Sequence, residues 1–269
     1  MRDPIPTDSK VSKKRDQAVA KRFERTWRRL QLLCPDPDSQ HRLGWLQQQF
    51  EMKQRGSMES AQAELDIATL LANAGFSLSF VKETETATAD LECYLGNDRL
   101  FVEVTVIVPT DPGRLRDAKN FPDPKIEEEG VDFLKDGLVK RLLARINEKA
   151  NQLADYCAPV VLAITIVHQE QSLLTNGNRN GRKMVLDLQQ LGGVTTQALV
   201  NAPHLSAVML TLWNIQPAES RSNIRLSNVS VGEWVSDPNG ISQVRSFAVN
   251  PMASYPIETE AYLALQRVL

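Results

Sequence analysis

The sequence predicts an α/β protein with a mixed central β-sheet flanked by helices, and three segments predict it. Residues 89–107 have the pattern of a β-hairpin, in which two alternating runs flank a turn at Gly96–Asp98. Residues 130–156 have helical character. The unbroken apolar run 159–167 that follows is typical of a strand buried on both faces. These segments indicate one sheet with helices packed on it.

Helices are predicted before the hairpin. Residues 10–29 carry nine lysines or arginines against two acidic residues, and aromatic and leucine residues recur at helical spacing within 23–30. This pattern predicts a basic amphipathic helix. The prolines and aspartates of residues 34–38 break that helix, and a second helix is predicted over 41–54.

The next elements are a helix and a strand. A third helix is predicted over Met58–Ala74, and Gly75 is a good residue to end it. The apolar residues of Phe76–Glu83 then predict the first strand of the sheet.

The hairpin carries acidic residues among its apolar ones. Period-two alternation places Glu103 and Thr105 on one face of the second strand, with three valines on the other. Asp90 lies in the first strand on the face that carries Glu92. Burying two carboxylates together is costly unless a positive group lies between them. A hard divalent cation with oxygen ligands is the usual solution.

The order helix, three strands, helix, strand, with Asp90 followed by Glu103-Val104-Thr105, resembles the PD-(D/E)XK superfamily of restriction-endonuclease-like nucleases. The resemblance covers Met58–Val167. It implies a restriction-endonuclease-like αβββαβ core. It also implies that Asp90, Glu103 and the carbonyl of Val104 hold Mg²⁺ or Mn²⁺, and that Glu64 of the preceding helix reaches the metal through water.

The chain departs from the family motif at Thr105, which stands where the catalytic lysine is expected. Some family members carry that lysine on the following helix, and Lys149 lies there, inside the apolar stripe of the helix. Either Lys149 replaces the missing strand lysine, or its ammonium snorkels toward the sheet edge. Gln152 and Tyr156 also resemble the glutamine-x-x-x-tyrosine motif of the exonuclease-like branch.

The remaining sequence is less informative. We expect 1–57 to be a basic helical extension, 58–168 the nuclease-like core, and 169–269 an extension of the same domain. Within the last part, Ala207–Trp213 predicts a strand that extends the sheet, and Tyr255–Leu269 predicts a closing helix.

Composition limits the function classes. The net charge of −2 gives no overall argument for nucleic acid, and three cysteines without metal-binding spacing predict reduced thiols. The chain lacks an apolar signal segment and any run of membrane-spanning length, so we expect a cytoplasmic protein without a membrane partner.

The cations instead concentrate in two helices. In the basic helix, Lys21, Arg25 and Arg28 are candidates for phosphate contacts, and in the helix of Lys149, Arg141 and Arg145 are candidates for backbone contacts. Docking of the apolar side of the basic helix on the core is the competing explanation, and both can hold together.

The sequence therefore predicts a metal-dependent nuclease that hydrolyses phosphodiester bonds, with Asp90, Glu103, Lys149, Gln152 and Glu64 as catalytic residues. Mg²⁺ or Mn²⁺ is the expected cofactor and nucleic acid, with DNA favoured, the expected partner; a homo-oligomer is compatible with the sequence. The alternative, which Thr105 favours, is a catalytically inactive protein of the same fold that binds nucleic acid or a protein partner as a scaffold.

Overall fold

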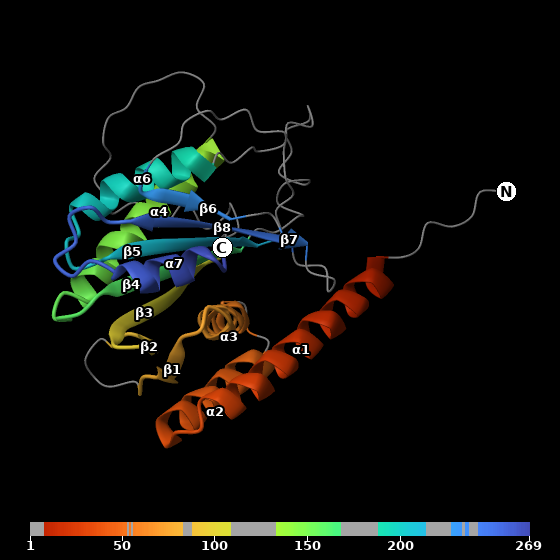
Figure 1. Ribbon diagram of the computed structural model, residues 1–269. Coiled ribbons are helices and arrows are strands. Elements are labelled where there is room, and N and C mark those ends of the chain that lie inside the picture. Colours follow the sequence, from red (N-terminus) through yellow and green to blue (C-terminus); the bar gives the residue numbers. More distant parts are fainter. Residues whose placement is uncertain are drawn as a thin grey trace.

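The computed structural model describes residues 8–52, 54, 56–82, 88–108, 133–167, 188–213, 227–232, 235–236 and 242–269. Within them the chain forms a mixed α/β structure in which helices cover both faces of a twisted sheet (Figure 1). The predicted mixed sheet with flanking helices is confirmed. In the described part of the chain, none of the helices has both the length and the apolar character needed to cross a bilayer.

The strands of the sheet follow the order β1-β2-β3-β4-β5-β8-β6, with β7 also paired to β8. Pairs β3–β4 and β4–β5 are parallel, and the other pairs are antiparallel. Parallel neighbours need a crossover connection, and β4, the central strand, is buried along its whole length. The strands are β1 (Ser77–Phe80), β2 (Leu91–Leu95), β3 (Asp98–Ile107), β4 (Val160–Val167), β5 (Ala207–Trp213), β6 (Val229–Val231), β7 (Val235–Ser236) and β8 (Ser242–Val249).

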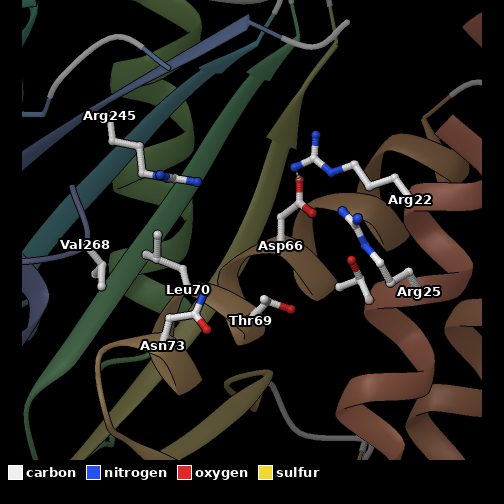
Figure 2. A pocket seen from close by; sticks show the side chains of 9 residues that line it. Arg22, Arg25, Asp66, Thr69, Leu70, Asn73, Arg245 and Val268 are labelled. Carbon is white, nitrogen blue, oxygen red and sulfur yellow. Dashed lines mark hydrogen bonds and ion pairs between the residues drawn. The ribbon is translucent and has the colours of Figure 1, made fainter. Parts of the chain in front are cut away.

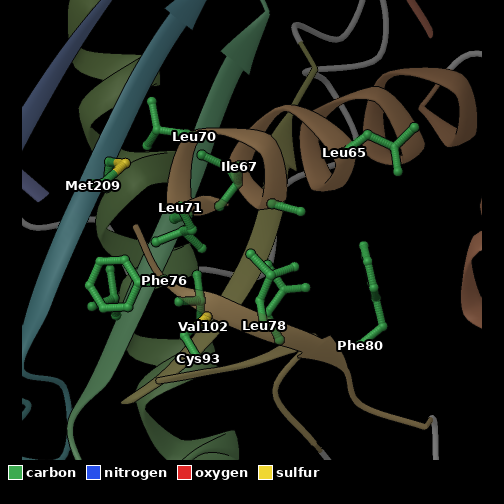
Figure 3. Packing of buried hydrophobic residues seen from close by; sticks show 14 of the residues in the cluster. Leu65, Ile67, Leu70, Leu71, Phe76, Leu78, Phe80, Cys93, Val102 and Met209 are labelled. Carbon is green, nitrogen blue, oxygen red and sulfur yellow. The ribbon is translucent and has the colours of Figure 1, made fainter. Parts of the chain in front are cut away.

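The helices divide between the two faces of the sheet, and each face has its own hydrophobic core. One face packs against α1 (Asp8–Leu33), α2 (Pro37–Glu51), α3 (Ser57–Asn73) and α7 (Thr259–Gln266). The other face packs against α4 (Phe133–Gln152) and α6 (Leu188–Val200). Successive side chains of β3 point to opposite faces of the sheet, so β3 contributes to both cores. Val102 belongs to the core on the α3 side and Phe101 to the core on the α4 side. Figure 3 shows Val102 and Cys93 of the hairpin beside Leu71 of α3.

The hairpin between β2 and β3 forms where the sequence places it. Leu95 pairs with Asp98 across a two-residue turn, and Gly96 has a φ of +60°, a conformation that a residue without a Cβ adopts at little cost. The first strand of the hairpin begins at Leu91, so Asp90 lies just before it rather than inside it.

The amino-terminal helices pack on the body of the protein. Phe23 and Leu30 of α1 are buried in the core of the α3 side, so the basic helix docks through its apolar face. The second helix begins at Pro37, four residues earlier than predicted, because Asp36 caps it by accepting the Ser39 N–H at 2.8 Å.

The remaining predicted elements match the described ones, with ends shifted by a few residues. The predicted ends at Glu83 and Gly130 lie outside the described residues. Helix α6 and strand β8 were not predicted. A Cβ on Gly192 of α6 would lie 2.6 Å from the Val229 side chain, so α6 contains glycine to approach β6 closely.

Candidate active site

Five charged side chains from different elements form a cluster beside the hairpin, which we call the carboxylate cluster. Its acidic members come from α3, from the residue before β2 and from β3, and its cations come from α2 and α4. They are Glu64, Asp90, Glu103, Arg42 and Lys149. The structure thus brings together four of the five predicted catalytic residues, together with Arg42, which was not predicted.

Asp90 lies just before β2, and its backbone N–H still donates to the Val102 carbonyl of β3 at 3.1 Å. Its neighbour Ala89 belongs to the core of the α4 side and Leu91 to the core of the α3 side, so the alternation of the strand is broken at Asp90. The Asp90 carboxylate accepts the backbone N–H of Val104 at 2.7 Å. Because this N–H lies in the middle of β3, the bond holds the Asp90 carboxylate next to the residue that follows Glu103.

Arg42 joins two of the carboxylates. It donates to both oxygens of Glu64, at 2.8 and 2.9 Å, and to Oδ1 of Asp90 at 2.8 Å. Its guanidinium also lies over the Trp45 ring, 4.4 Å from the ring centroid. The side chains of Arg42 and Glu64 are only 8% and 6% exposed, so this two-oxygen pairing is formed away from water.

Lys149 contacts the third carboxylate. Its ammonium donates to Oε1 of Glu103 at 2.5 Å, and their side chains are 14% and 5% exposed. Leu142 and Ile146 of the same helix are fully buried, as is Leu153 just after it, so Lys149 lies in the apolar stripe that the sequence predicted. Thr105, two residues after Glu103 in β3, is also buried. Lys149 therefore supplies an ammonium beside Glu103, two residues before Thr105 in the same strand.

Burial and mutual repulsion change the proton affinity of the acidic groups. Burial, followed by the charge of Asp90, raises the pKa of Glu64 to about 8 against the opposing effect of Arg42. Burial and the charge of Asp90 also raise the pKa of Glu103 to about 7, while Lys149 lowers it. The charge of Asp90 thus raises the pKa of both of these carboxyl groups.

Two observations test whether these residues suit a divalent cation. Oε2 of Glu103 is buried, and no hydrogen bond reaches it from the described residues. Asp90 and Glu103 offer carboxylate oxygens, the donors that Mg²⁺ prefers. In the described part of the chain, no three acidic, histidine or cysteine side chains converge into a metal-binding group. Asp90 and Glu103 thus fit the donor chemistry of a divalent cation, and Arg42 and Lys149 compete with a cation for the same carboxylates.

The other predicted residues of α4 lie apart from the cluster or at its edge. Gln152 is half-buried at the end of α4, and no hydrogen bond joins it to the cluster among the described residues. Arg145 pairs with Glu148 at 3.1 Å, and burial lowers the pKa of Arg141. The Tyr156 hydroxyl accepts the backbone N–H of Ala89 at 2.6 Å, which fixes the residue before Asp90.

The predicted phosphate-contacting residues of α1 are exposed. Lys21, Arg25 and Arg28 all face solvent, and Arg28 pairs with Glu24 one turn earlier. The side chains of the basic residues at positions 10–15 lie outside what the structure describes. Helix α1 therefore packs on the core through its apolar side, and its basic side remains exposed to solvent.

Arg42 was missed although the sequence carried a signal for it. Arg42 precedes Trp45 by three residues and Leu46 by four, which places it on the inner face of a helix. An arginine at such a position needs an acidic partner, because an unpaired buried charge is costly. The identity of that partner depended on how α2 packs against α3.

Comparison of the sequence with models of known protein families finds no match, and comparison with curated proteins finds no significant relative. The fold and the carboxylate cluster are therefore the basis for assigning a function.

Proposed function

We propose that this protein is a metal-dependent nuclease with a restriction-endonuclease-like core, in which the carboxylate cluster is the active site. The observation that carries the proposal is the contact between Lys149 and Glu103. It joins a helix ammonium to a strand carboxylate next to Asp90, with Thr105 at the position of the family's strand lysine. The substrate class is nucleic acid, with DNA favoured.

Asp90 and Glu103 would hold Mg²⁺ or Mn²⁺, and the Val104 backbone lies against Asp90. The bound ion would lower the pKa of a water and offset negative charge on the scissile phosphate. Glu64 holds Arg42, and Arg42 donates to Oδ1 of Asp90 while the Val104 N–H donates to Oδ2. Asp90 is thereby fixed by two donors before any substrate arrives.

Lys149 has a separate role at its Nζ atom. The ammonium donates to Glu103 in the absence of substrate, and in the reaction it would orient the attacking water or contact a phosphate oxygen. Burial keeps this ammonium close to the carboxylates, so its charge acts in a medium of lower dielectric than water.

Thermal unfolding with and without Mn²⁺, followed by nuclease assays, tests the proposal. Mn²⁺ should raise the melting temperature, because an ion that binds the native state stabilises it by mass action. The protein should then cleave plasmid, linear duplex, single-stranded DNA or RNA in Mn²⁺ and not in chelator. Glu103→Gln should lose both responses.

The matched control is Glu92→Gln. Glu92 lies on β2 and pairs with Arg99 on the exposed side of the hairpin, so its substitution should leave both responses intact. If Mn²⁺ neither stabilises the protein nor supports cleavage of any of the four substrates, the nuclease assignment is wrong.

A specific observation favours a second function, an inactive scaffold of the same fold. Arg42 and Lys149 already pair with the acidic side chains, so the cluster can stabilise the fold as an internal ion-pair network. Nucleic-acid binding that is insensitive to Mn²⁺ and leaves the substrate intact would support this function over the nuclease.

A further inference from the structure

A polar pocket of about 390 Å³ lies between α1, α3 and β8 (Figure 2). We call it the arginine pocket. Helix α1 contributes Arg22 and Arg25, α3 contributes Asp66 and Thr69, and β8 contributes Arg245. None of these residues belongs to the carboxylate cluster.

The pocket carries more positive than negative charge. Three arginines line it, and Asp66 is the acidic side chain among its lining residues. Arg22 donates to Asp66 at 2.8 Å, with both side chains 9% exposed, and Gln62 donates to the other oxygen of Asp66. Asp66 is thus held by Arg22 and Gln62, and Arg25 and Arg245 remain as positive charge in excess.

Polar atoms around the pocket lack partners within the described part of the chain. Nε of Arg245 and Oγ1 of Thr69 are buried, and no hydrogen bond reaches either of them there. Burial lowers the pKa of Arg245, and the nearby Arg22 lowers it further against the effect of Asp66. A guanidinium removed from water in this way is stabilised by an anion that accepts its hydrogen bonds.

We propose that the arginine pocket binds a phosphate group. Arg245 from the sheet and Arg25 from α1 approach the pocket from different elements, and Figure 2 shows the Arg245 guanidinium directed toward Asp66 and Arg22. Planar guanidinium groups match the paired oxygens of a phosphate. Asp66 holds Arg22 in place rather than excluding the anion, because two further positive charges outweigh its one negative charge.

The phosphate can come from two sources. A pocket of this volume is within the range of small-ligand sites, roughly 300–1,000 Å³, so it is large enough for a phosphate that carries a further group, such as a nucleotide. Arg25 is exposed on the same helix as Lys21 and Arg28, so a nucleic-acid strand lying along α1 can also present a backbone phosphate. The proposal is independent of cleavage, since it uses no residue of the carboxylate cluster.

Calorimetric titration of the full chain in chelator tests this site with three probes: inorganic phosphate, a nucleoside monophosphate and a short single-stranded oligonucleotide. Arg25→Gln and Arg245→Gln should each weaken binding about tenfold, because each removes charge-assisted hydrogen bonds. Arg99→Gln is the matched control, since it removes one arginine charge from the hairpin, outside the pocket and outside α1.

Saturable binding of the two small probes that weakens about tenfold in both pocket variants supports the site and identifies a free phosphate compound as its ligand. The same pattern for the oligonucleotide alone supports the site and identifies a backbone phosphate. Absence of saturable binding by every probe, or equal weakening in Arg25→Gln and Arg99→Gln, overturns the proposal. Arg25 is exposed, so its variant decides the question even if Arg245→Gln does not fold.

Discussion

The carboxylate cluster and the arginine pocket both use α3, and they have opposite charge balance. Glu64 and Asp66 are two residues apart, which places them roughly 200° apart around the helix, so they face different neighbours. The cluster that contains Glu64 has three acidic side chains and two cations, whereas the pocket that contains Asp66 has three arginines and one acidic side chain. One helix thus supports a group suited to a cation and another suited to an anion.

The two regions also differ in how their charges are paired. In the carboxylate cluster, Arg42 and Lys149 each contact a carboxylate, and the side chains are largely removed from water. The arginine pocket includes the exposed Arg25 and the buried Nε of Arg245, which donates no hydrogen bond to the described residues. The cluster is therefore preorganised by internal contacts, while the pocket has donors available for an exchangeable ligand.

The largest expected effect is on the cleavage rate, and it distinguishes a catalytic role of the cluster from a purely stabilising one. Lys149→Ala should lower the cleavage rate by about 10²–10⁴-fold, because it removes a group that positions the attacking water or a phosphate oxygen. Folding and the response to Mn²⁺ should be retained. Glu148→Gln, which changes an exposed side chain next to Lys149 on the same helix, should cleave normally. Normal cleavage by Lys149→Ala would exclude the role of Lys149.

Removal of Arg42 should have the largest effect on stability. Arg42→Ala leaves the buried Glu64 without its two-oxygen partner, and loss of one member of a buried ion pair costs about 3–5 kcal/mol of unfolding free energy. Denaturant unfolding measures this change. Arg99→Ala breaks a more exposed pair with Glu92 and should cost at most about 1 kcal/mol. Similar losses in the two variants would show that Arg42 does not stabilise the cluster in this way.

The stability of the metal-free protein should fall as the pH rises. Burial raises the pKa of Glu103 to about 7 and of Glu64 to about 8, so between pH 4.5 and 8 the native state binds more protons than the unfolded state. The unfolding free energy then decreases with pH through that window. Thermal unfolding in chelator should show this slope, and Glu103→Gln should flatten it. A slope of the opposite sign would contradict the raised pKa values.

The fold was largely predictable because its central elements have strong local patterns. The β2–β3 hairpin has a turn that suits Gly96 and clear alternation, and β4 is an unbroken apolar run. Helix α6 and strand β8 lack such patterns. Helix α6 contains Gly192 for close approach to Val229, and β8 carries polar residues such as Arg245 toward the arginine pocket.

The carboxylate cluster was predictable where spacing along one element placed its residues. Glu103 follows from strand alternation, and Lys149 from its place in the helical stripe. The contacts of Arg42 depend on how α2 packs against α3, and the arginine pocket depends on how α1, α3 and β8 are placed together. Contacts between elements far apart in the sequence leave no periodic pattern, so these contacts could not be predicted from the sequence alone.

The smallest expected effect concerns the exposed cations of α1. Deleting the helix is not a clean test, because Phe23 and Leu30 are buried in the core. Lys21→Gln and Arg28→Gln change only exposed side chains. Each should weaken oligonucleotide binding modestly and reduce the slope of log affinity against log salt by roughly 0.7–0.9 per lost phosphate contact.

The same two variants sharpen the distinction between the basic face of α1 and the arginine pocket. Neither residue lines the pocket, so binding of inorganic phosphate should stay at the level of the unchanged protein in both variants. The measurement is a salt titration of oligonucleotide binding beside a phosphate titration in chelator, with Arg99→Gln as a control on the exposed side of the hairpin. Unchanged salt slopes in Lys21→Gln and Arg28→Gln would mean that α1 serves the fold alone, through its buried apolar face. Reduced salt slopes with unchanged binding of inorganic phosphate would show that the exposed face of α1 and the arginine pocket act separately. The face of α1 would attract nucleic acid through its distributed charge, and the pocket would bind a single anion.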